Sequence, residues 1–221
     1  MPRKRTAILI SGRGSNMTAL IEAARDRDYP AEIALVLSNR PDADGLQRAA
    51  DAGIETAMVD HRTFGKDRLA FERALQDVLL QHRIEIVCLA GFMRILTAWF
   101  VAQWPERMLN IHPALLPAFK GLDTHRRAIE AGVTEHGATV HFVVPEMDSG
   151  PIIAQGRVPV HPDDTAAALA ARVLALEHRI YPLALKLVAS DRVHVTNGRC
   201  VITGAIGPED AAYLPALAGP Q

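Results

Sequence analysis

Asn110 and His112 carry the most direct catalytic chemistry in this 221-residue sequence. They stand two positions apart in an apolar run that Pro113 closes. On a β-strand, this spacing sends both side chains to the same face, and the proline then ends regular pairing. An amide donor beside an imidazole is suited to stabilising an oxyanion and to moving protons. The alternative interpretation is a structural histidine at the end of a strand.

Asp148 is a second titratable candidate, and it lies in a turn between two β-rich segments. Ser149, Gly150 and Pro151 follow it, which is turn chemistry in its own right. In one interpretation the carboxylate only hydrogen-bonds its own turn. In the other it reaches His112, raises the pKa of the imidazole by its charge and holds a water. The sequence leaves both interpretations open, because the two residues lie far apart in the chain.

The glycine-rich segment Ser11–Asn16 is a candidate anion site, because it joins an apolar run to a helical pattern. Backbone N–H groups and the helix dipole favour an anion at such a junction, and Ser15 and Asn16 offer side-chain donors and helix-cap oxygens. A dinucleotide fingerprint fails, because Met17 takes the place of the third glycine and Ser38 that of the acidic ribose ligand. No Gly-Lys-Ser/Thr of a P-loop follows either. The segment therefore predicts a site for a small monophosphate, with a well-capped tight turn as the alternative.

The elements that position these residues follow from hydrophobic periodicity. Short apolar runs alternate with helical patterns in the first half of the chain, and in the 68–82 pattern Leu69, Phe71, Leu75, Val78 and Leu79 recur at helical spacing. Such alternation predicts a parallel sheet with helical crossovers. The strand candidates are 7–10, 33–37, 56–59, 84–89 and 108–111, and the helix candidates are 17–24, 43–52 and 68–82.

A change of pattern after Gly137 predicts a different arrangement. The β-rich segments 138–144 and 151–160 follow one another without a helix, which favours an antiparallel addition to the sheet. A helix over 164–187 follows, with caps from residues 163–165 and an interruption or kink expected at Pro182. Asn197-Gly198 predicts a hairpin between 193–195 and 199–202, and a loosely ordered tail is expected from Gly207.

We therefore expect an α/β, Rossmann-like fold: a mostly parallel, helix-covered sheet with antiparallel strands added in the C-terminal part. We expect residues 1–190 to form the catalytic domain, and residues 191–221 to form a C-terminal hairpin and tail of the same domain.

Composition narrows the class of protein. Twenty-four Lys and Arg oppose 25 Asp and Glu, and this balance argues against a bulk nucleic-acid or anionic-membrane binder. Cys88 and Cys200 are too few for a disulfide framework, and no metal-binding spacing occurs. The apolar run near the N-terminus is too short for a signal peptide or a membrane span. We expect a cytoplasmic protein without a metal, acting as a monomer or homodimer, with no nucleic-acid or membrane partner.

Taken together, these segments resemble the phosphoribosylglycinamide formyltransferases of the formyltransferase family. The resemblance extends from Ile8–Asn16 to Glu177–Pro182 with nearly gapless spacing, and its most characteristic stretches are Asn110–Pro117 and Gly137–Pro151. It implies transfer of a formyl group from the co-substrate 10-formyltetrahydrofolate to the amine of 5-phospho-ribosylglycinamide, in purine biosynthesis. The implied mechanism is direct attack by the amine, with Asn110 and protonated His112 donating to the oxyanion and Asp148 relaying a proton.

The resemblance also assigns binding residues. Asn110, His112 and Asp148 correspond to the catalytic set. The implied ribonucleotide site comprises Gly12, Gly14, Ser15, Asn16, Met17, Thr18 and Glu177. The implied folate site comprises Arg68, Met93, Arg94, Ile95, Leu96, Val144, Pro145, Glu146 and Met147. The chain carries an extra residue around 65–67, beside Arg68, and core packing is the alternative interpretation of 93–96.

Three other functions remain as alternatives. A methionyl-tRNA formyltransferase would carry a further C-terminal domain and a basic surface, and a formyltetrahydrofolate hydrolase would carry a regulatory domain before the first strand. Neither is expected in this chain. A nucleotide- or folate-binding module without activity gives no reason for Asn110, His112 and Asp148 to occur together.

Overall fold

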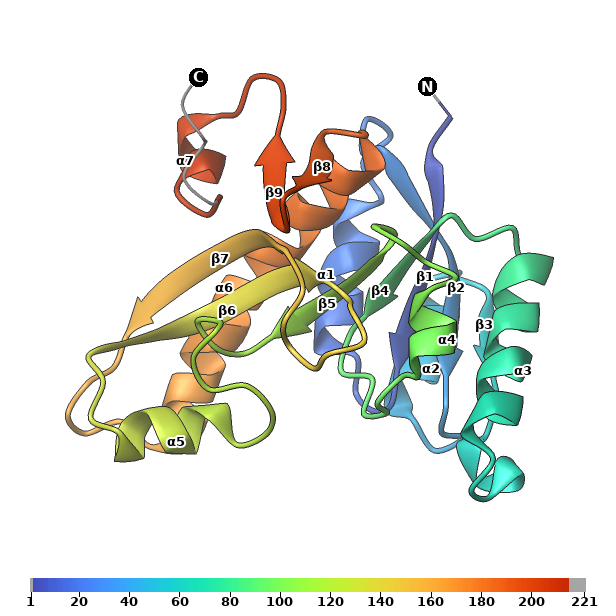
Figure 1. Ribbon diagram of the computed structural model, residues 1–221, viewed down its shortest axis with the longest axis horizontal. Coiled ribbons are helices and arrows are strands. Elements are labelled where there is room, and N and C mark those ends of the chain that lie inside the picture. Colours follow the sequence, from blue (N-terminus) through green and yellow to red (C-terminus); the bar gives the residue numbers. More distant parts are fainter. Residues whose placement is uncertain (1, 215–221) are drawn as a thin grey trace. The chain divides into compact units, whose positions relative to one another are not determined.

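The computed structural model describes residues 2–214, and the chain divides into two compact units, Met1–Asn110 and Ile111–Gln221. Unit 1 is built on parallel strands in the order β3-β2-β1-β4-β5 (Figure 1). Their bounds are β1 Lys4–Ile10, β2 Ala31–Ser38, β3 Thr56–Met58, β4 Ile86–Leu89 and β5 Met108–His112. The predicted parallel sheet of the first half is confirmed, with each predicted apolar run lying on one of these strands.

The strands of unit 1 are continuous apolar runs in the sequence because they are buried in its core. Ala7–Ile10 in β1 and Leu35–Leu37 in β2 are fully buried, as is Cys88 in β4. A parallel strand covered on both faces has no solvent side, so apolar and polar residues do not alternate along it.

The helices of unit 1 connect successive strands. They are α1 Ser15–Ala23, α2 Asp44–Asp51, the 3₁₀ turn η1 His61–Phe64, α3 Arg68–Gln81 and α4 Ala98–Val101. Helix α1 packs with α2, and α3 packs with α4. The buried face of α3 differs from the predicted one: Leu69 is exposed, and Glu72 is buried beside Phe71 and Leu75. The short helix α4 was not predicted, because four residues hold too little periodicity to be recognised.

Unit 2 is built on an antiparallel pair, β6 Glu135–Phe142 and β7 Ile152–Pro159, as predicted. Strand β5 crosses the boundary of the units, and the seven strands follow the order β3-β2-β1-β4-β5-β6-β7. Helix α6 Ala166–Ala189 packs on both β6 and β7. Its N-cap is Thr165, whose hydroxyl accepts from the Ala168 N–H, so the predicted cap chemistry is found.

Two predictions in unit 2 need correction, and one of its helices was not predicted. Helix α6 is not interrupted at Pro182: the residues on either side, Tyr181 and Leu183, are buried, and their packing offsets the hydrogen bond that proline cannot donate. The tail is not wholly irregular, because Pro208–Ala211 forms the short helix α7; residues 215–221 lie outside the described part. Helix α5 Thr124–Glu130 was not predicted.

The predicted hairpin at Asn197-Gly198 is present as β8 Val193–Thr196 and β9 Arg199–Ile202. Both turn residues have positive φ (51° and 73°), as a type I′ turn requires.

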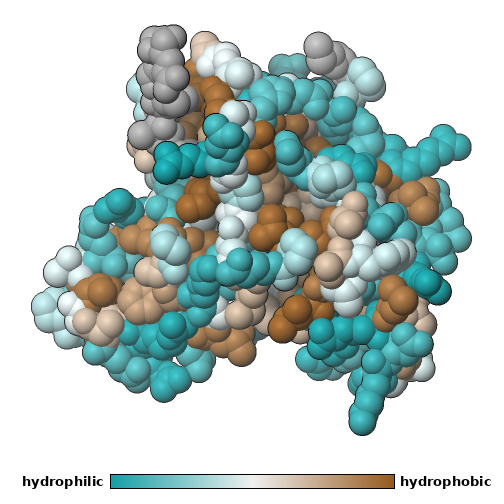
Figure 2. Space-filling view, in the orientation of Figure 1, coloured by the Kyte–Doolittle hydropathy of each residue, from teal (hydrophilic) through white to brown (hydrophobic). Residues whose placement is uncertain are grey.

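The surface of the chain carries apolar side chains in separate places. Figure 2 shows hydrophobic patches scattered over a largely hydrophilic face. The exposed large apolar residues include Met58, Met93, Ile95, Leu122 and Met147. Of the helices in residues 2–214, none combines the length and the apolar character needed to cross a membrane.

Candidate active site

The glycine-rich loop of unit 1 begins α1 through its backbone. Gly14 is the N-cap, in a left-handed conformation (φ 68°, ψ 40°), and its carbonyl accepts from the N–H and the hydroxyl of Thr18 at 3.0 and 3.2 Å. A side chain here would meet Met17 at 3.1–3.4 Å, so the turn needs glycine. The expectation that Ser15 or Asn16 caps the helix is wrong, because neither residue is the N-cap and no side chain bonds the cap position. The start of α1 thus presents main-chain N–H groups on a glycine turn, which is the geometry that binds phosphate groups.

The other residues of this loop differ in exposure. Ser15 and Asn16 are half-buried and Thr18 is exposed, whereas the side chain of Met17 is fully buried. Met17 therefore offers a ligand only its main chain. The carbonyl of Gly12 accepts from the Gly45 N–H, and this bond joins the loop to the first turn of α2.

The segment between β4 and α4, residues 90–97, contains four of the predicted folate residues. Met93 and Ile95 are 68% and 61% exposed, Arg94 is half-buried with its guanidinium 5.9 Å from the centre of the Phe71 ring, and Leu96 is buried. Core packing, the alternative interpretation of this segment, therefore describes Leu96 but not Met93 or Ile95. The segment displays two apolar side chains to solvent from an irregular backbone.

His112 lies at the end of β5, two residues after Asn110 on the same strand. Its ring is buried and has acceptors at both nitrogens: Nε2 lies 3.0 Å from the Phe119 carbonyl oxygen, and Nδ1 lies 3.5 Å from Oδ2 of Asp148. The structure therefore brings Asp148 to His112, although the two lie far apart in the chain. An imidazolium would donate toward an acceptor on each side in this setting.

Asp148 is positioned by its own backbone conformation, by a main-chain donor and by a second imidazole, all within unit 2. Its backbone is left-handed (φ 50°), a conformation that aspartate tolerates, and its Oδ2 accepts from the Gly121 N–H at 2.9 Å. Its Oδ1 lies 3.9 Å from Nε2 of His141. The carboxylate is thus a shared centre for two imidazoles and a backbone donor, rather than a residue that serves only its own turn.

His141 belongs to this cluster and was not among the predicted residues. Burial lowers the pKa of His141, while the Phe142 carbonyl and the charge of Asp148 oppose that shift. Its Nδ1 lies 2.8 Å from the Phe142 carbonyl oxygen, which leaves Nε2 as the nitrogen that faces Asp148. Position 141 lies near the end of β6, just after a register shift between Val140 and His141, so period-two alternation along the strand did not single it out in the sequence.

The loop after β6 carries the remaining predicted folate residues. Val144 is half-buried, while Pro145, Glu146 and Met147 are exposed. Lys120 contacts this loop at two residues: its Nζ lies 3.8 Å from the Glu146 carboxylate and 2.5 Å from the Ser149 hydroxyl. This loop therefore presents polar and apolar side chains beside Asp148.

Glu177 and Arg68 were predicted to bind the two substrates. Glu177 is buried in α6 of unit 2, and Arg68 is exposed at the first position of α3 in unit 1. Asp67 caps that helix by accepting from the Ala70 N–H at 2.9 Å, and Gly65 has a positive φ. Residues 65–67, where an extra residue was expected, thus lie in the turn that precedes α3.

Two further histidines line the interior of unit 2. The rings of His125 and His136 lie 5.3 Å apart, and Phe119 packs on His136 at 5.7 Å. Burial lowers the pKa of His136 to about 4, and it also lowers that of His125. Both rings are therefore neutral at pH 7.

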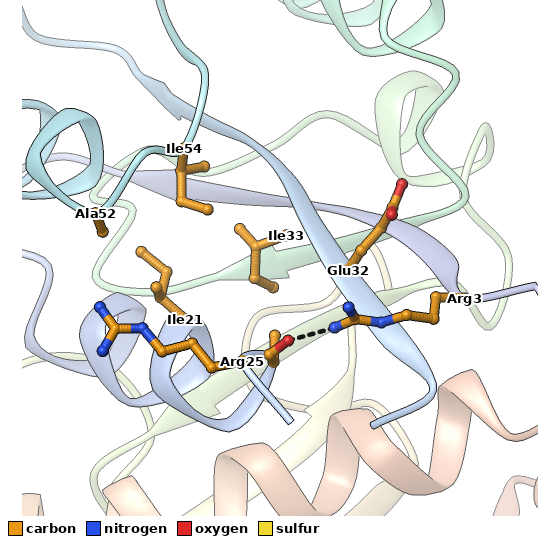
Figure 3. Close-up of a pocket in the computed structure, with 8 residues that line it drawn as sticks. Arg3, Ile21, Arg25, Glu32, Ile33, Ala52 and Ile54 are labelled. Atoms are coloured by element: carbon orange, nitrogen blue, oxygen red, sulfur yellow. Dashed lines mark hydrogen bonds between the residues drawn. The ribbon is translucent and has the colours of Figure 1, made fainter. Parts of the chain in front are cut away.

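Neither metal ligation nor the hollow in Figure 3 adds to the predicted site residues. In residues 2–214 no group of three or more His, Cys, Asp or Glu side chains is arranged to hold a metal ion. A hollow in unit 1 is lined by Arg3, Ile21, Arg25, Glu32 and Ile54 (Figure 3). The guanidinium of Arg3 donates there to the main-chain carbonyls of Ala24 and Ala31. None of the predicted site residues lines the hollow.

Comparison with known proteins places these features in a family. The formyl transferase family pattern matches residues 4–185. The phosphoribosylglycinamide formyltransferase of Haemophilus influenzae is 41% identical over 206 residues, which are 93% of this chain and 97% of that protein. The human trifunctional purine biosynthetic protein adenosine-3 is 50% identical over 198 residues, 89% of this chain. This chain spans about a fifth of that protein, since the match covers 20% of its length.

A solved structure agrees with the sequence matches. Glycinamide ribonucleotide transformylase 1 from Symbiobacterium toebii superposes with a TM-score of 0.88 at 44% identity, over 91% of this chain and 95% of that one. The fold, the glycine-rich loop and the Asn-His-Asp set thus occur in a chain that matches the family along most of its length. The chain belongs to the formyl transferase family.

Proposed function

We propose that this chain transfers the formyl group of 10-formyltetrahydrofolate to the amine of 5-phospho-ribosylglycinamide, a step of purine biosynthesis. The observation that carries the proposal is the pairing of His112 with Asp148 at 3.5 Å, two residues from Asn110 on β5. This set supplies an oxyanion donor, a titratable donor and a proton acceptor, which are the three groups that acyl transfer to an amine requires. The 41% identity to a phosphoribosylglycinamide formyltransferase over nearly its full length supports the choice of substrates.

His112 acts as the donor to the developing oxyanion. Asp148 lies on the Nδ1 side and orients the ring, which leaves Nε2 as the nitrogen that faces the substrate. In the structure Nε2 lies 3.0 Å from the Phe119 carbonyl oxygen, so the substrate oxygen takes the place of that carbonyl when substrate binds. Asn110 adds the second hydrogen bond, because its side chain projects from the same face of β5.

Asp148 accepts the proton that the attacking amine releases and returns it to the leaving nitrogen. The amine bonds to the formyl carbon and gives up a proton, and the donor nitrogen gains one when its bond to that carbon breaks. A carboxylate between two imidazoles, with one oxygen held by the Gly121 N–H, accepts and returns such a proton through a water. No covalent intermediate on the protein is needed.

The binding roles follow the two units. In unit 1, Gly12, Gly14, Ser15, Asn16, Met17 and Thr18 bind the ribonucleotide phosphate through the start of α1, and Arg68, Met93, Arg94, Ile95 and Leu96 contribute to the folate site. In unit 2, Glu177 binds the ribose, while Val144, Pro145, Glu146 and Met147 complete the folate site. We further propose that residues 1–190 form the catalytic domain and that the protein is cytoplasmic, needs no metal, and acts as a monomer or homodimer without nucleic-acid or membrane partners.

One assay separates this function from its relatives. The protein is given 10-formyltetrahydrofolate with 5-phospho-ribosylglycinamide, with formyl-acceptor tRNA, or with water alone, and loss of the formyl group is followed. Turnover that depends on the ribonucleotide is expected. Turnover only with tRNA, or equal turnover in water alone, would assign a different member of the family, and binding without turnover in all three would refute the enzyme. The His112→Ala variant is the control for contaminating activity.

A further inference from the structure

The segment Phe92–Thr97 of unit 1 is irregular, and its two ends are held by buried polar groups. It belongs to no helix or strand, yet it displays Met93 and Ile95 to solvent between the buried Phe92 and Leu96. Irregular backbone with exposed apolar side chains is ordinarily mobile, because few contacts offset its conformational entropy. Buried polar groups at the two ends of the segment supply those contacts.

The first end is fixed by Ser11. The Met93 N–H donates to Oγ of Ser11 at 2.8 Å, and that hydroxyl donates to Oδ1 of Asn39 at 2.6 Å. Asn39 is 1% exposed, and its main-chain carbonyl oxygen lies 2.8 Å from Nδ1 of His61. Because the Ser11 N–H also donates to the Gly91 carbonyl, Ser11 holds the chain on both sides of Phe92.

The second end is fixed by Glu72, a carboxylate only 1% exposed on the apolar face of α3. Its Oε1 accepts from the Thr97 N–H at 2.7 Å, and its Oε2 accepts from the Thr97 hydroxyl. Thr97 is also the N-cap of α4. A buried carboxylate is costly unless strong hydrogen bonds compensate it, and here both of its oxygens are committed to one residue at the end of the segment.

We propose that Glu72 and Ser11 are positioning residues that fix both ends of the segment Met93–Thr97 and thereby set the affinity for the folate co-substrate. This inference rests on the proposed function, and it assigns a role to Glu72, which touches neither substrate. With the backbone held at positions 93 and 97, the side chains of Met93 and Ile95 are presented in one arrangement before the ligand arrives. A flat ring system then binds without the entropic cost of ordering the segment.

The principal test compares Glu72→Ala with Glu72→Gln. The alanine variant removes both acceptors, and we expect the KM for 10-formyltetrahydrofolate and the dissociation constant for tetrahydrofolate to rise about tenfold. The glutamine variant keeps one carbonyl oxygen for the Thr97 N–H, so the rise should be less than about threefold. The KM for the ribonucleotide should change less than about twofold in both variants, because the glycine-rich loop is not bonded to Glu72.

Gln76→Ala is the matched control. Gln76 lies one turn further along α3, and its side chain accepts from Nε1 of Trp104 at 2.9 Å. This variant removes a comparable hydrogen bond from the same helix without touching the segment. It should destabilise unit 1 while leaving the tetrahydrofolate affinity unchanged. An equal loss of affinity in Gln76→Ala and Glu72→Ala would show that Glu72 acts only through stability, and would overturn the proposal.

A readout independent of activity completes the experiment. Hydrogen exchange of the Met93 and Thr97 amides, followed by NMR, should accelerate in Glu72→Ala at Thr97 and in Ser11→Ala at Met93, and in neither for Gln76→Ala. If Glu72→Ala does not fold, Ser11→Ala carries the test through the Met93 amide. Unchanged exchange at Thr97 in folded Glu72→Ala, or at Met93 in Ser11→Ala, would refute the fixing of that end.

Failure of the positioning role and failure of the proposed function give different results. Wild-type protein that binds tetrahydrofolate but transfers no formyl group refutes the function alone. Wild-type protein that transfers the group, with an unchanged tetrahydrofolate affinity in Glu72→Ala, refutes the positioning role alone. Wild-type protein that does not bind tetrahydrofolate overturns both.

Discussion

Two polar regions of the molecule are built on different principles. In unit 1, Ser11, Asn39 and Glu72 direct their side chains at main-chain groups and at one another, and hold a loop and a segment in place. In unit 2, Asp148 is surrounded by imidazoles whose charge depends on pH. Under the proposed function, the first region contributes geometry and the second contributes proton chemistry. Buried polar groups would then serve binding in unit 1 and reactivity in unit 2.

The histidines sharpen this contrast. In unit 1 the bond between Nδ1 of His82 and the Val78 carbonyl raises the pKa of His82, with Glu55 adding to the effect. In unit 2 burial lowers the pKa values of His125, His136 and His141. Protonation of these histidines therefore favours the folded state at His82 in unit 1 and opposes it at His125, His136 and His141 in unit 2.

The largest expected effect is the loss of His112. His112→Ala removes one donor to the oxyanion, which typically lowers kcat by about 10²–10³-fold. Asp148→Asn should be of similar severity, because the amide neither accepts the proton nor favours the imidazolium by charge. Steady-state kinetics measure both, and His82→Ala in unit 1 is the control for loss of a histidine. Near-normal kcat in folded His112→Ala and Asp148→Asn would contradict the mechanism.

The next largest effect is a loss of stability in acid that is confined to unit 2. Folded His136 stays neutral down to a pKa of about 4, whereas the unfolded chain takes up the proton near pH 6.5. Stability is therefore complete above that value and falls between about pH 6.5 and 4, by at most about 3 kcal/mol for this residue. His125 adds to the loss in the same direction.

Hydrogen exchange read unit by unit measures this acid effect. Amides of unit 2 should lose protection across that pH range before those of unit 1, where the raised pKa of His82 opposes the trend. In His136→Phe the pH dependence of unit 2 should become shallower. A greater acid sensitivity in unit 1 would break the contrast between the units.

A smaller effect is expected from the glycine-rich loop. Gly14→Val places a branched side chain at φ 68° and against Met17, so the start of α1 must shift, and the KM for the ribonucleotide should rise about tenfold. Gly53→Val imposes similar backbone strain at φ 77° in open space after α2, and is the matched control. A selective rise in the KM for the folate in Gly14→Val would overturn the assignment of this loop.

The smallest effect compares one exposed methionine from each unit. Met93→Ala and Met147→Ala remove side chains that are 68% and 53% exposed, so each should weaken tetrahydrofolate binding by about 1 kcal/mol, about fivefold. Calorimetry of the two variants tests the folate-binding role of each methionine. Met58→Ala, an exposed methionine on β3 outside the predicted site, should leave the affinity unchanged.

Much of the fold and part of the site could be predicted before any coordinates. Apolar runs located the strands, and the absence of a helix between 138–144 and 151–160 identified the antiparallel pair. The Asn197-Gly198 turn was recognisable because its chemistry is local. Predictions failed where a local rule met tertiary packing, as at Pro182 in α6, or where an element was as short as α4.

The sequence by itself determined the alternation of strands and helices, the spacing of Asn110 and His112 on one strand, and the glycine turn at the start of α1. Each depends on residues a few positions apart, and backbone geometry dictates their relation. Only the tertiary structure decided that Asp148 faces His112, that His141 joins them, and that Glu72 holds Thr97. His112 and Asp148 lie 36 positions apart and Glu72 and Thr97 lie 25 apart. Chain folding brings each pair together at a cost in loop-closure entropy that no local pattern records.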